Sequence, residues 1–523
     1  MSSGGVAFAS SEGRWVLGAT VLGSAVVFLE GTVVNVALPE IGRDLDAGVA
    51  GLQWTLNGYL LTLAALILVG GSLGDRYGRR RLFEIGVVWF TAASVLCAAA
   101  PNVELLVVAR VLQGIGGALL TPGSLAIIQA TFREEDRARA IGAWSALGGI
   151  AAAVGPLVGG WLVDTVSWRW IFLINLPLGA LVLWVSRRHL PESRDPRAGG
   201  RLDLTGALLA AVALAGITYA LIQGPEQGAG SPAVVGFALI GLAAAMGFVA
   251  AERRNPRPML PLDIFSSRQF TGANLVTFAV YAALGGVFFL FVVFLQVSLD
   301  YSAVAAGAAS LPITILMLFL SARAGALAQR IGPRIPLTIG PLVIAAGMVL
   351  MGGIDPGDSY VAGVLPAVVV FGLGLSAVVA PVTSTVLAAA DPRHSGLASG
   401  VNNAVSRTAQ LLAVAVLPVA AGLSGGDFQD PVALADGFRT AMFIAAGLCV
   451  AGALLAWTTI SSDVLEDAER PERGECKRAL EQAPEHHCAV AGAPMHAAPR
   501  ASVTNTVQSA RETVTRASSD ERF

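Results

Sequence analysis

The sequence predicts an all-α integral membrane protein with fourteen membrane-spanning helices, and two observations lead to this fold class. The chain of 523 residues is 54% hydrophobic and only 13% charged, about half the charged fraction that is typical of a soluble protein. Its apolar residues fall in long runs, without the alternation of a half-buried strand or the stripe of an amphipathic helix. Runs of 18 or more apolar residues are typical of helices that cross a bilayer.

Each predicted span is long enough for a membrane. A run of about 20 residues crosses a hydrocarbon layer of ~30 Å at a rise of ~1.5 Å per residue. Gly and Pro occur within the runs, which membrane helices tolerate. In chain order, we expect helices at residues 15–38, 52–74, 82–100, 104–128, 138–163, 168–188, 203–223, 232–251, 270–297, 303–328, 334–354, 361–388, 398–422 and 437–460.

The placement of arginines in the loops predicts the orientation of the helices, because cytoplasmic loops carry an excess of basic residues. Alternate loops contain most of the arginines, namely Arg76, Arg79, Arg80 and Arg81; Arg133, Arg137 and Arg139; Arg187, Arg188, Arg194, Arg197 and Arg201; and Arg253, Arg254, Arg257 and Arg268. The intervening loops contain mostly acids, with Arg43, Arg169 and Arg439 as their only arginines. With an even number of helices, both termini are expected in the cytoplasm.

The stretch "GSLGDRYGRRR", Gly71 to Arg81, lies between the second and third predicted helices. Its glycines permit a sharp turn and close packing of helices, and its arginines can pair with Asp75. An orientation signal alone would explain such a loop. The spacing, however, resembles the loop between helices 2 and 3 of the major facilitator superfamily, which acts there as a gate latch between two bundles. The resemblance assigns the gate loop to Gly71, Asp75, Arg76, Gly78, Arg79 and Arg80.

Three further stretches resemble motifs of the same superfamily. "RVLQGIGGALLTPGS" (Arg110 to Ser124) is similar to its helix 4 motif. "GGIAAAVGPLVGGWL" (Gly148 to Leu162) is similar to the helix 5 motif of its exporters and contains Gly155, Pro156, Gly159 and Gly160. "WRWIFLINLPLG", with "VVNVALPEI" and "QWTLNGYLL", resembles the fourteen-helix branch of drug:proton antiporters. Close helix packing alone would also explain the glycines of the second stretch.

The resemblance implies a major facilitator fold with two six-helix bundles. It divides the chain into a cytoplasmic N-terminus (1–14), an N-terminal bundle (15–202), two extra helices (203–256), a C-terminal bundle (257–460) and a tail (461–523). The tail is charged and rich in Ala, Ser and Thr, which predicts a disordered cytoplasmic segment.

Two charged residues within the predicted helices are candidates for proton coupling. Glu30 and Arg110 lie about 13 and 9 Å from the outer ends of their helices, at ~1.5 Å per residue, so they can meet across the membrane interior. An ionisable residue in a membrane helix is a candidate functional residue. A structural hydrogen bond of Glu30, or a structural bond of Arg110 to the backbone, is the alternative.

The sequence also offers polar candidates for lining a substrate cavity, namely Asn57, Gln113, Asn402, Asn403 and Arg407. The Arg407 side chain can equally extend towards the cytoplasm.

Together, these features predict a proton-driven exporter of lipophilic, often cationic drugs or dyes. The partners are a small-molecule substrate, protons and the lipid bilayer, and we expect a functional monomer in a bacterial cell membrane. The alternatives are an exporter of one metabolite, such as a self-made antibiotic, siderophore or amino acid, and, more remotely, a sensor or scaffold without transport activity. A net charge of −2 gives no sign of nucleic-acid binding. We expect no metal, since His486, His487, Cys488 and His496 fit no ligand pattern. We also expect no cofactor and no enzyme activity, since the sequence shows no Ser-His-Asp or Cys-His set in a plausible site.

Overall fold

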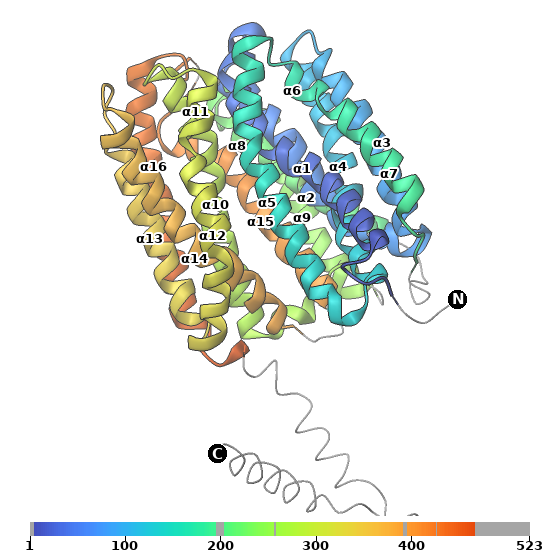
Figure 1. Ribbon diagram of the computed structural model, residues 1–523. Coiled ribbons are helices and arrows are strands. Elements are labelled where there is room, and N and C mark those ends of the chain that lie inside the picture. Colours follow the sequence, from blue (N-terminus) through green and yellow to red (C-terminus); the bar gives the residue numbers. More distant parts are fainter. Residues whose placement is uncertain (1–4, 195–202, 256–257, 391–394, 425, 466–523) are drawn as a thin grey trace, which may run out of the picture. The chain divides into compact units, whose positions relative to one another are not determined.

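The computed structural model describes residues 5–194, 203–255, 258–390, 395–424 and 426–465. All of the elements assigned in these ranges are helices (Figure 1). The first half of the chain forms α1 (Ser11–Asp44), α2 (Val49–Tyr77), α3 (Arg79–Ala98), α4 (Val103–Thr131), α5 (Glu134–Thr165), α6 (Trp170–Leu173), α7 (Asn175–His189), α8 (Leu204–Gln227) and α9 (Pro232–Arg254). The second half forms η1 (Leu262–Ser266), α10 (Arg268–Val297), α11 (Ala303–Ala309), α12 (Leu311–Ile331), α13 (Arg334–Gly352), η2 (Tyr360–Val364), α14 (Leu365–Ala388), α15 (Ser395–Ala420) and α16 (Pro431–Thr459).

The predicted spans are confirmed. Among the described residues, fourteen helical segments are long and apolar enough to cross a membrane. Three of these segments are composite: α6 joins α7, α11 joins α12, and η2 joins α14. Short polar side chains begin several helices by accepting backbone N–H groups, as Asn102 does from Leu105 for α4, which satisfies donors that the first turn leaves unpaired.

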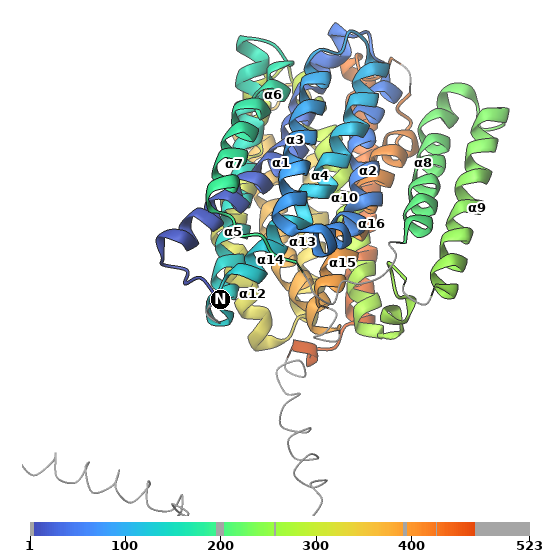
Figure 2. The ribbon, with the colours of Figure 1, turned by 90° about the vertical axis from the view of Figure 1, so that its right-hand side faces the viewer.

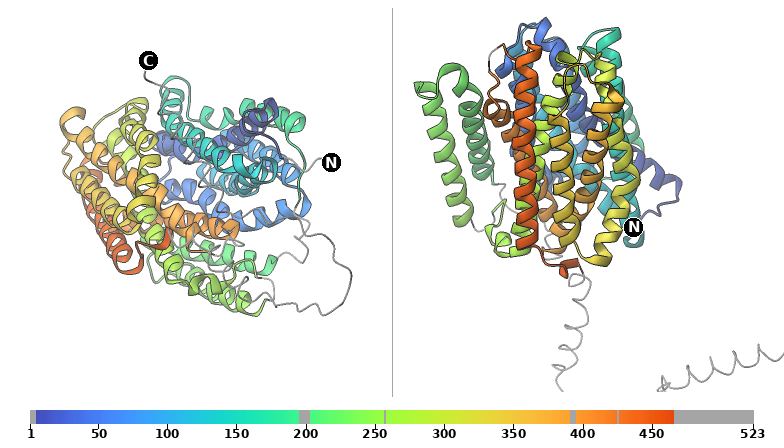
Figure 3. Two further views of the ribbon diagram at one scale, coloured as in Figure 1. Left: turned by 60° about the horizontal axis from the view of Figure 1, so that its bottom comes forward. Right: turned by 90° about the vertical axis from the view of Figure 1, so that its left-hand side faces the viewer.

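The helices pack in two groups, which we call the first group (α1–α7) and the second group (α10–α16). In the first group α1 packs on α5, α2 on α4, and α3 on α4 and α7. In the second group α10 packs on α15 and α16, α13 on α14 and α16, and α12 on α14. Helices α8 and α9 pack on each other, and α8 also contacts α2 and α15 (Figures 2 and 3). This packing agrees with the expected bundles, whose sequence boundaries stay a prediction.

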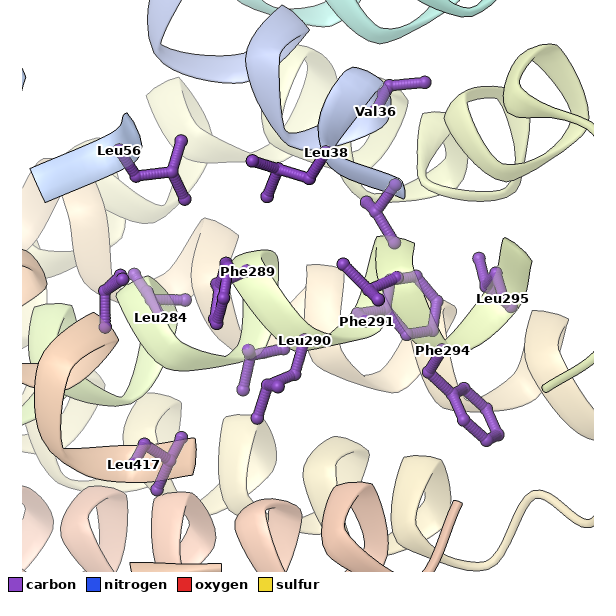
Figure 4. Packing of buried hydrophobic residues seen from close by; sticks show 14 of the residues in the cluster. Val36, Leu38, Leu56, Leu284, Phe289, Leu290, Phe291, Phe294, Leu295 and Leu417 are labelled. Atoms are coloured by element: carbon purple, nitrogen blue, oxygen red, sulfur yellow. The ribbon is translucent and has the colours of Figure 1, made fainter. Parts of the chain in front are cut away.

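The two groups meet most extensively at the end where α1 ends and α2 begins, which we call the packed end. Gln296 of α10 donates to the Val36 carbonyl of α1 at 2.9 Å, and Gln53 of α2 donates to the Val414 carbonyl of α15 at 2.8 Å. One continuous apolar cluster joins both groups here. Figure 4 shows side chains of α1 and α2 above those of α10 and α15, among them Val36, Leu38, Leu56, Leu284, Phe289, Phe291 and Leu417. In a membrane, such van der Waals packing holds helices together.

The packed part of the chain extends beyond the predicted start of the tail at residue 461. Val464 and Leu465 are buried against Ala328 of α12, and the Ser461 N–H donates to Gln269 at 2.9 Å. The tail prediction is therefore wrong for residues 461–465, because two apolar side chains of this segment pack against α12. Its remainder, 466–523, lies outside the described residues.

Candidate functional site

The structure brings Glu30 and Arg110 together as a buried ion pair in the interior of the first group. Glu30 of α1 is 0% exposed and Arg110 of α4 is 1% exposed. The Arg110 Nη1 donates to Glu30 Oε1 and to Gln113 Oε1 at 2.5 Å, while its Nε donates to the Thr55 carbonyl at 2.9 Å. The comparison of helix depths indicated only that these two side chains could meet.

Asn175 and Ser94 complete the environment of the pair, and sequence reasoning missed both. Asn175 Nδ2 donates to Glu30 Oε2 at 3.0 Å and to Ser94 Oγ at 3.2 Å. Gln113 Nε2 donates to the same Ser94 hydroxyl at 2.9 Å. Both oxygens of the Glu30 carboxylate therefore accept hydrogen bonds. The available signal was Asn175 itself, a lone amide in the apolar run "FLINLPLG".

Aromatic rings flank the Arg110 guanidinium. The Tyr59 ring centroid of α2 lies 4.6 Å from Arg110 Cζ, and the Phe172 centroid of α6 lies 5.8 Å away. A buried ion pair tolerates the loss of one partner poorly, at a cost of about 3–5 kcal/mol, because the other charge is left without compensation. Protonation of Glu30 removes its negative charge but leaves the side chain in place. The Arg110 guanidinium then lacks a counter-charge and keeps only its neutral contacts.

The predicted helix 5 motif lies against both helix groups. A side chain at Gly155 or Gly159 would collide with Thr32 or Val33 of α1. One at Gly160 would collide with the backbone of α11, and the Pro156 carbonyl lies against Gly307 of α11. The glycines thus allow α5 to approach α1 on one side and the second group on the other.

An acid at the end of α5 extends this contact with the second group. The Asp164 carboxylate accepts the backbone N–H groups of Ala303 at 3.0 Å and Val304 at 2.8 Å, which lie in the first turn of α11. It supplies acceptors and negative charge to the positive end of that helix. The sequence predicted only that Asp164 lies in an acidic loop.

The predicted gate loop is a single-residue turn between α2 and α3. Gly78 has a φ of +118°, a conformation that L side chains rarely adopt. Asp75 lies within the last turns of α2 and pairs with Arg79, whose Nη2 lies 2.7 Å from Asp75 Oδ1. Gly71 lies beside Pro122 of α4.

Glu192, which follows α7, and Glu84 of α3 contact the other side of this turn. Glu192 accepts the backbone N–H groups of Arg80 and Arg81, both at 3.1 Å, at the start of α3. The Arg80 side chain pairs with Glu84 at 2.9 Å. Arg76 lies over the Tyr77 ring, with its Cζ 5.2 Å from the centroid. Sequence reasoning did not name Glu192 or Glu84, since neither belongs to the recognised motif.

The five cavity candidates do not form one cluster. Gln113 belongs to the buried Glu30–Arg110 network. Asn402 donates to Asn274 at 3.2 Å and Thr277 at 2.9 Å of α10, whereas exposed Asn403 donates to the Ser399 carbonyl of its own helix at 3.1 Å.

Asn57 and Arg407, the remaining two candidates, are incompletely paired. Asn57 is 0% exposed, and neither atom of its amide group has a hydrogen-bond partner. Half-buried Arg407 donates to Gln410 at 3.4 Å.

Comparison with protein families gives one match across most of the chain. The model described as Major Facilitator Superfamily matches residues 20–414. Among characterised sequences, the chain is 36% identical to the puromycin resistance protein of Streptomyces alboniger, over 86% of this chain and 91% of that protein. It is 34% identical to the tetracenomycin C resistance and export protein of Streptomyces glaucescens, over 80% and 78% of the two chains.

Solved structures show the same fold at low sequence identity. A bacterial homologue of the human lysosomal transporter Spinster, in an inward-facing and unoccupied conformation, has a TM-score of 0.63 and 19% identity, over 88% of this chain and 99% of that one. A D-xylose–proton symporter has a TM-score of 0.62 and 16% identity, over 86% and 98% of the two chains. These solved structures therefore share the arrangement of helices with this chain.

Proposed function

Because this chain belongs to the major facilitator superfamily, we propose that it exports lipophilic drugs or dyes across the cell membrane in exchange for protons. Members of the superfamily are transporters of small molecules, not enzymes. The direction of transport is supported by relatives named for antibiotic resistance and, in the case of tetracenomycin C, for export. The multi-pass membrane location is supported by the fourteen spans.

The buried Glu30 site is the observation that supports proton coupling. A carboxylate held by an arginine and an amide in the membrane interior is a place where a proton can be bound and released. When the carboxylate takes up a proton, Arg110 loses its counter-charge and must rely on Gln113, the Thr55 carbonyl and the Tyr59 ring. The contacts of α1, α4 and α2 therefore depend on the protonation state of Glu30.

Helix α1 connects this proton site to the contact between the groups. Glu30 lies between Leu29 and Thr32, which face Gly155 of α5, and two turns further the Val36 carbonyl accepts Gln296 of α10. A change in α1 on protonation can thus be transmitted to the packed end. Alternating access requires such a link between ion binding and the movement of one bundle against the other.

The proposed orientation places the packed end outside the cell. The turns opposite that end contain the arginine-rich loops, whereas Asp44 and Asp164 lie at the packed end. With the N-terminus in the cytoplasm, the described conformation is closed to the outside. The entry of one proton down a potential of 100 mV supplies about 2.3 kcal/mol, and each pH unit adds about 1.4 kcal/mol.

Substrate-induced proton release tests the proposal. Purified protein in a weakly buffered solution receives puromycin, tetracenomycin C or ethidium, and the pH is followed with a soluble indicator. We expect a compound that is exported from cells to release protons from the wild type and none from Glu30→Gln, whose amide cannot ionise. The matched control is Glu252→Gln, since Glu252 is also buried, with 2% exposure, but lies at the end of α9.

The two variants separate a coupling role of Glu30 from a general effect of removing a buried acid. Undiminished proton release in Glu30→Gln would remove Glu30 from the mechanism. Efflux that persists in everted vesicles without a proton gradient would contradict antiport. Efflux of a single compound from a broad panel would favour the alternative, an exporter of one metabolite.

A further inference from the structure

Arg407 is an ionisable residue near the middle of α15 that the proton site does not use. It lies twelve residues after Ser395, or about 18 Å along the helix at ~1.5 Å per residue. Its Nη1 donates to Gln410, one turn nearer to the packed end, at 3.4 Å. Among the residues that the structure describes, no carboxylate lies within ion-pair distance of Arg407. A guanidinium has five N–H donors, and one long bond to a neutral amide leaves most of them unsatisfied.

The packing of α15 against α2 places Arg407 at the contact between the two helix groups. The helices run antiparallel, with Gln53 bonded to Val414 near the packed end and Leu68 against Gly400 towards the other end. Arg407 lies midway between Val414 and Gly400, so it is opposite the segment of α2 around Tyr59.

Asn57 adds an unsatisfied neutral group to the same contact. It lies four residues after Gln53, so it shares the face of α2 that is directed at α15. Its amide is fully buried without a hydrogen-bond partner. A buried polar group that lacks a partner costs about 1–3 kcal/mol, which a ligand with acceptor atoms would offset. Arg407 and Asn57 thus offer a charged and a neutral donor from opposite helix groups.

The Glu30 carboxylate, in contrast, is not available to a substrate in this conformation. Both of its oxygens accept hydrogen bonds from within the first group, and its side chain is fully buried. The expectation of cationic substrates depended on Glu30 as an acid that lines the cavity. With Glu30 occupied by Arg110 and Asn175, the unpaired charge at the contact between the groups is positive.

We propose that Arg407, assisted by Asn57, binds the acidic group of the exported compound, and that the substrates are lipophilic organic anions that carry a carboxylate or an ionised phenol. This inference deepens the proposed function and depends on it, since it assigns the substrate class of the same transporter. An apolar hollow of about 180 Å³ is lined by Phe278 of α10 and by Val401, Ala404 and Thr408 of α15, and Ala404 lies about one turn before Arg407 on the same helix. It offers room for an apolar part of the bound compound.

Equilibrium binding of three pyrene probes tests the substrate class without a proton gradient. Pyrenebutanoate, pyrenebutanol and pyrenebutyl-trimethylammonium share an aromatic body and differ in the charge of the head group. Binding is followed by energy transfer from tryptophan in protein held in phosphatidylcholine nanodiscs. We expect the wild type to bind pyrenebutanoate at least tenfold more tightly than the cation. Arg407→Gln should lower the affinity for pyrenebutanoate about tenfold and leave that for pyrenebutanol unchanged, and Arg407→Lys should retain the preference for the acid.

Arg323 provides the matched control. It lies in α12, is exposed, and bonds only to the Phe319 carbonyl of its own helix, at 3.1 Å. Arg323→Gln should bind all three probes like the wild type. Equal binding of the three probes, tighter binding of the cation, or an unchanged acid affinity in Arg407→Gln would overturn the proposal.

Two further measurements distinguish substrate binding at Arg407 from lipid binding and from proton coupling. Nanodiscs that contain phosphatidylglycerol test a lipid head group as the anion, and loss of the acid preference in them would assign Arg407 to lipid and overturn the proposal. If proton release is absent from the wild type but the acid preference depends on Arg407, then the proposed proton coupling fails and the substrate class stands.

Discussion

The Glu30 network shows what can be predicted about a single buried residue. The sequence placed Glu30 and Arg110 at similar depths, since depth depends only on the count of residues from a helix end. It did not identify Asn175, because which side chain faces Glu30 depends on the rotation of α7 about its axis. That rotation is fixed by packing, such as the approach of Gly179 in α7 to Thr91 of α3. The ion pair was therefore predictable and its third partner was not.

Asn175→Ala tests whether this third partner matters for coupling. The variant removes the donor to Glu30 Oε2 and leaves a buried carboxylate oxygen unsatisfied, at a cost of about 1–3 kcal/mol. We expect proton-driven transport in everted vesicles to fall about tenfold, with probe binding in the absence of a gradient unchanged. Asn403→Ala is the control, since that exposed amide bonds only within its own helix. Wild-type transport by Asn175→Ala would show that Arg110 alone positions the carboxylate.

At the scale of helices, α5 is an element whose contacts the sequence predicted only in part. The motif with Gly155 and Gly159 indicated close packing without a partner, and the structure identifies α1 as that partner. The role of Asp164 could not be predicted, because its carboxylate accepts the N–H group of Ala303, which lies 139 residues further along the chain. Such a contact depends on how the two groups dock, which no local pattern records.

Asp164→Ala should weaken the packed end. Loss of a helix cap costs about 1 kcal/mol, which is roughly a fivefold change in the ratio of closed to open conformations. Spin labels at Val166→Cys and Val361→Cys, two exposed positions on different groups, report the separation between the groups by pulsed electron resonance. We expect long distances between the two labels to be more populated in Asp164→Ala than in the labelled protein without this substitution.

Asp430→Ala is the matched control for this experiment. Asp430 caps α16 by accepting the N–H groups of Val432 and Ala433, so it uses the same chemistry within a single group. Its loss should leave the distances between the groups unchanged. An equal shift in both variants would attribute the effect to general loosening of helix ends, and no shift in Asp164→Ala would remove the cap from the closing contact.

For the whole molecule, the sequence predicted the number of spans, with bounds that differ from those of the helices by up to six residues, as at Asp44 and Pro431. It did so because lipid selects for length and apolar composition, both of which are local properties. The prediction of a tail from residue 461 was wrong at residues 461–465, where Val464 and Leu465 pack beside α12. Two apolar residues are too few to distinguish a packed segment from a disordered one. The conformation could not be predicted either. Whether the packed end or its opposite is closed depends on small differences between two arrangements of the same helices.

The orientation of the whole chain is the remaining prediction, and its reason is the separation of charge between the two ends. Tyr77 lies beside the arginines of the gate loop, and Asp358 lies between α13 and η2, where the predicted loop is acidic. Both positions are exposed, and Tyr77→Cys leaves all four arginines from Arg76 to Arg81 in place.

In a background with Cys476 and Cys488 replaced by serine, a membrane-impermeant maleimide should label Asp358→Cys in intact cells. It should label Tyr77→Cys only after the cells are permeabilised. Cys97 and Cys449 need no replacement, since both are buried at 0% exposure. Labelling of Tyr77→Cys in intact cells would reverse the orientation, and the packed end would then close the cytoplasmic side.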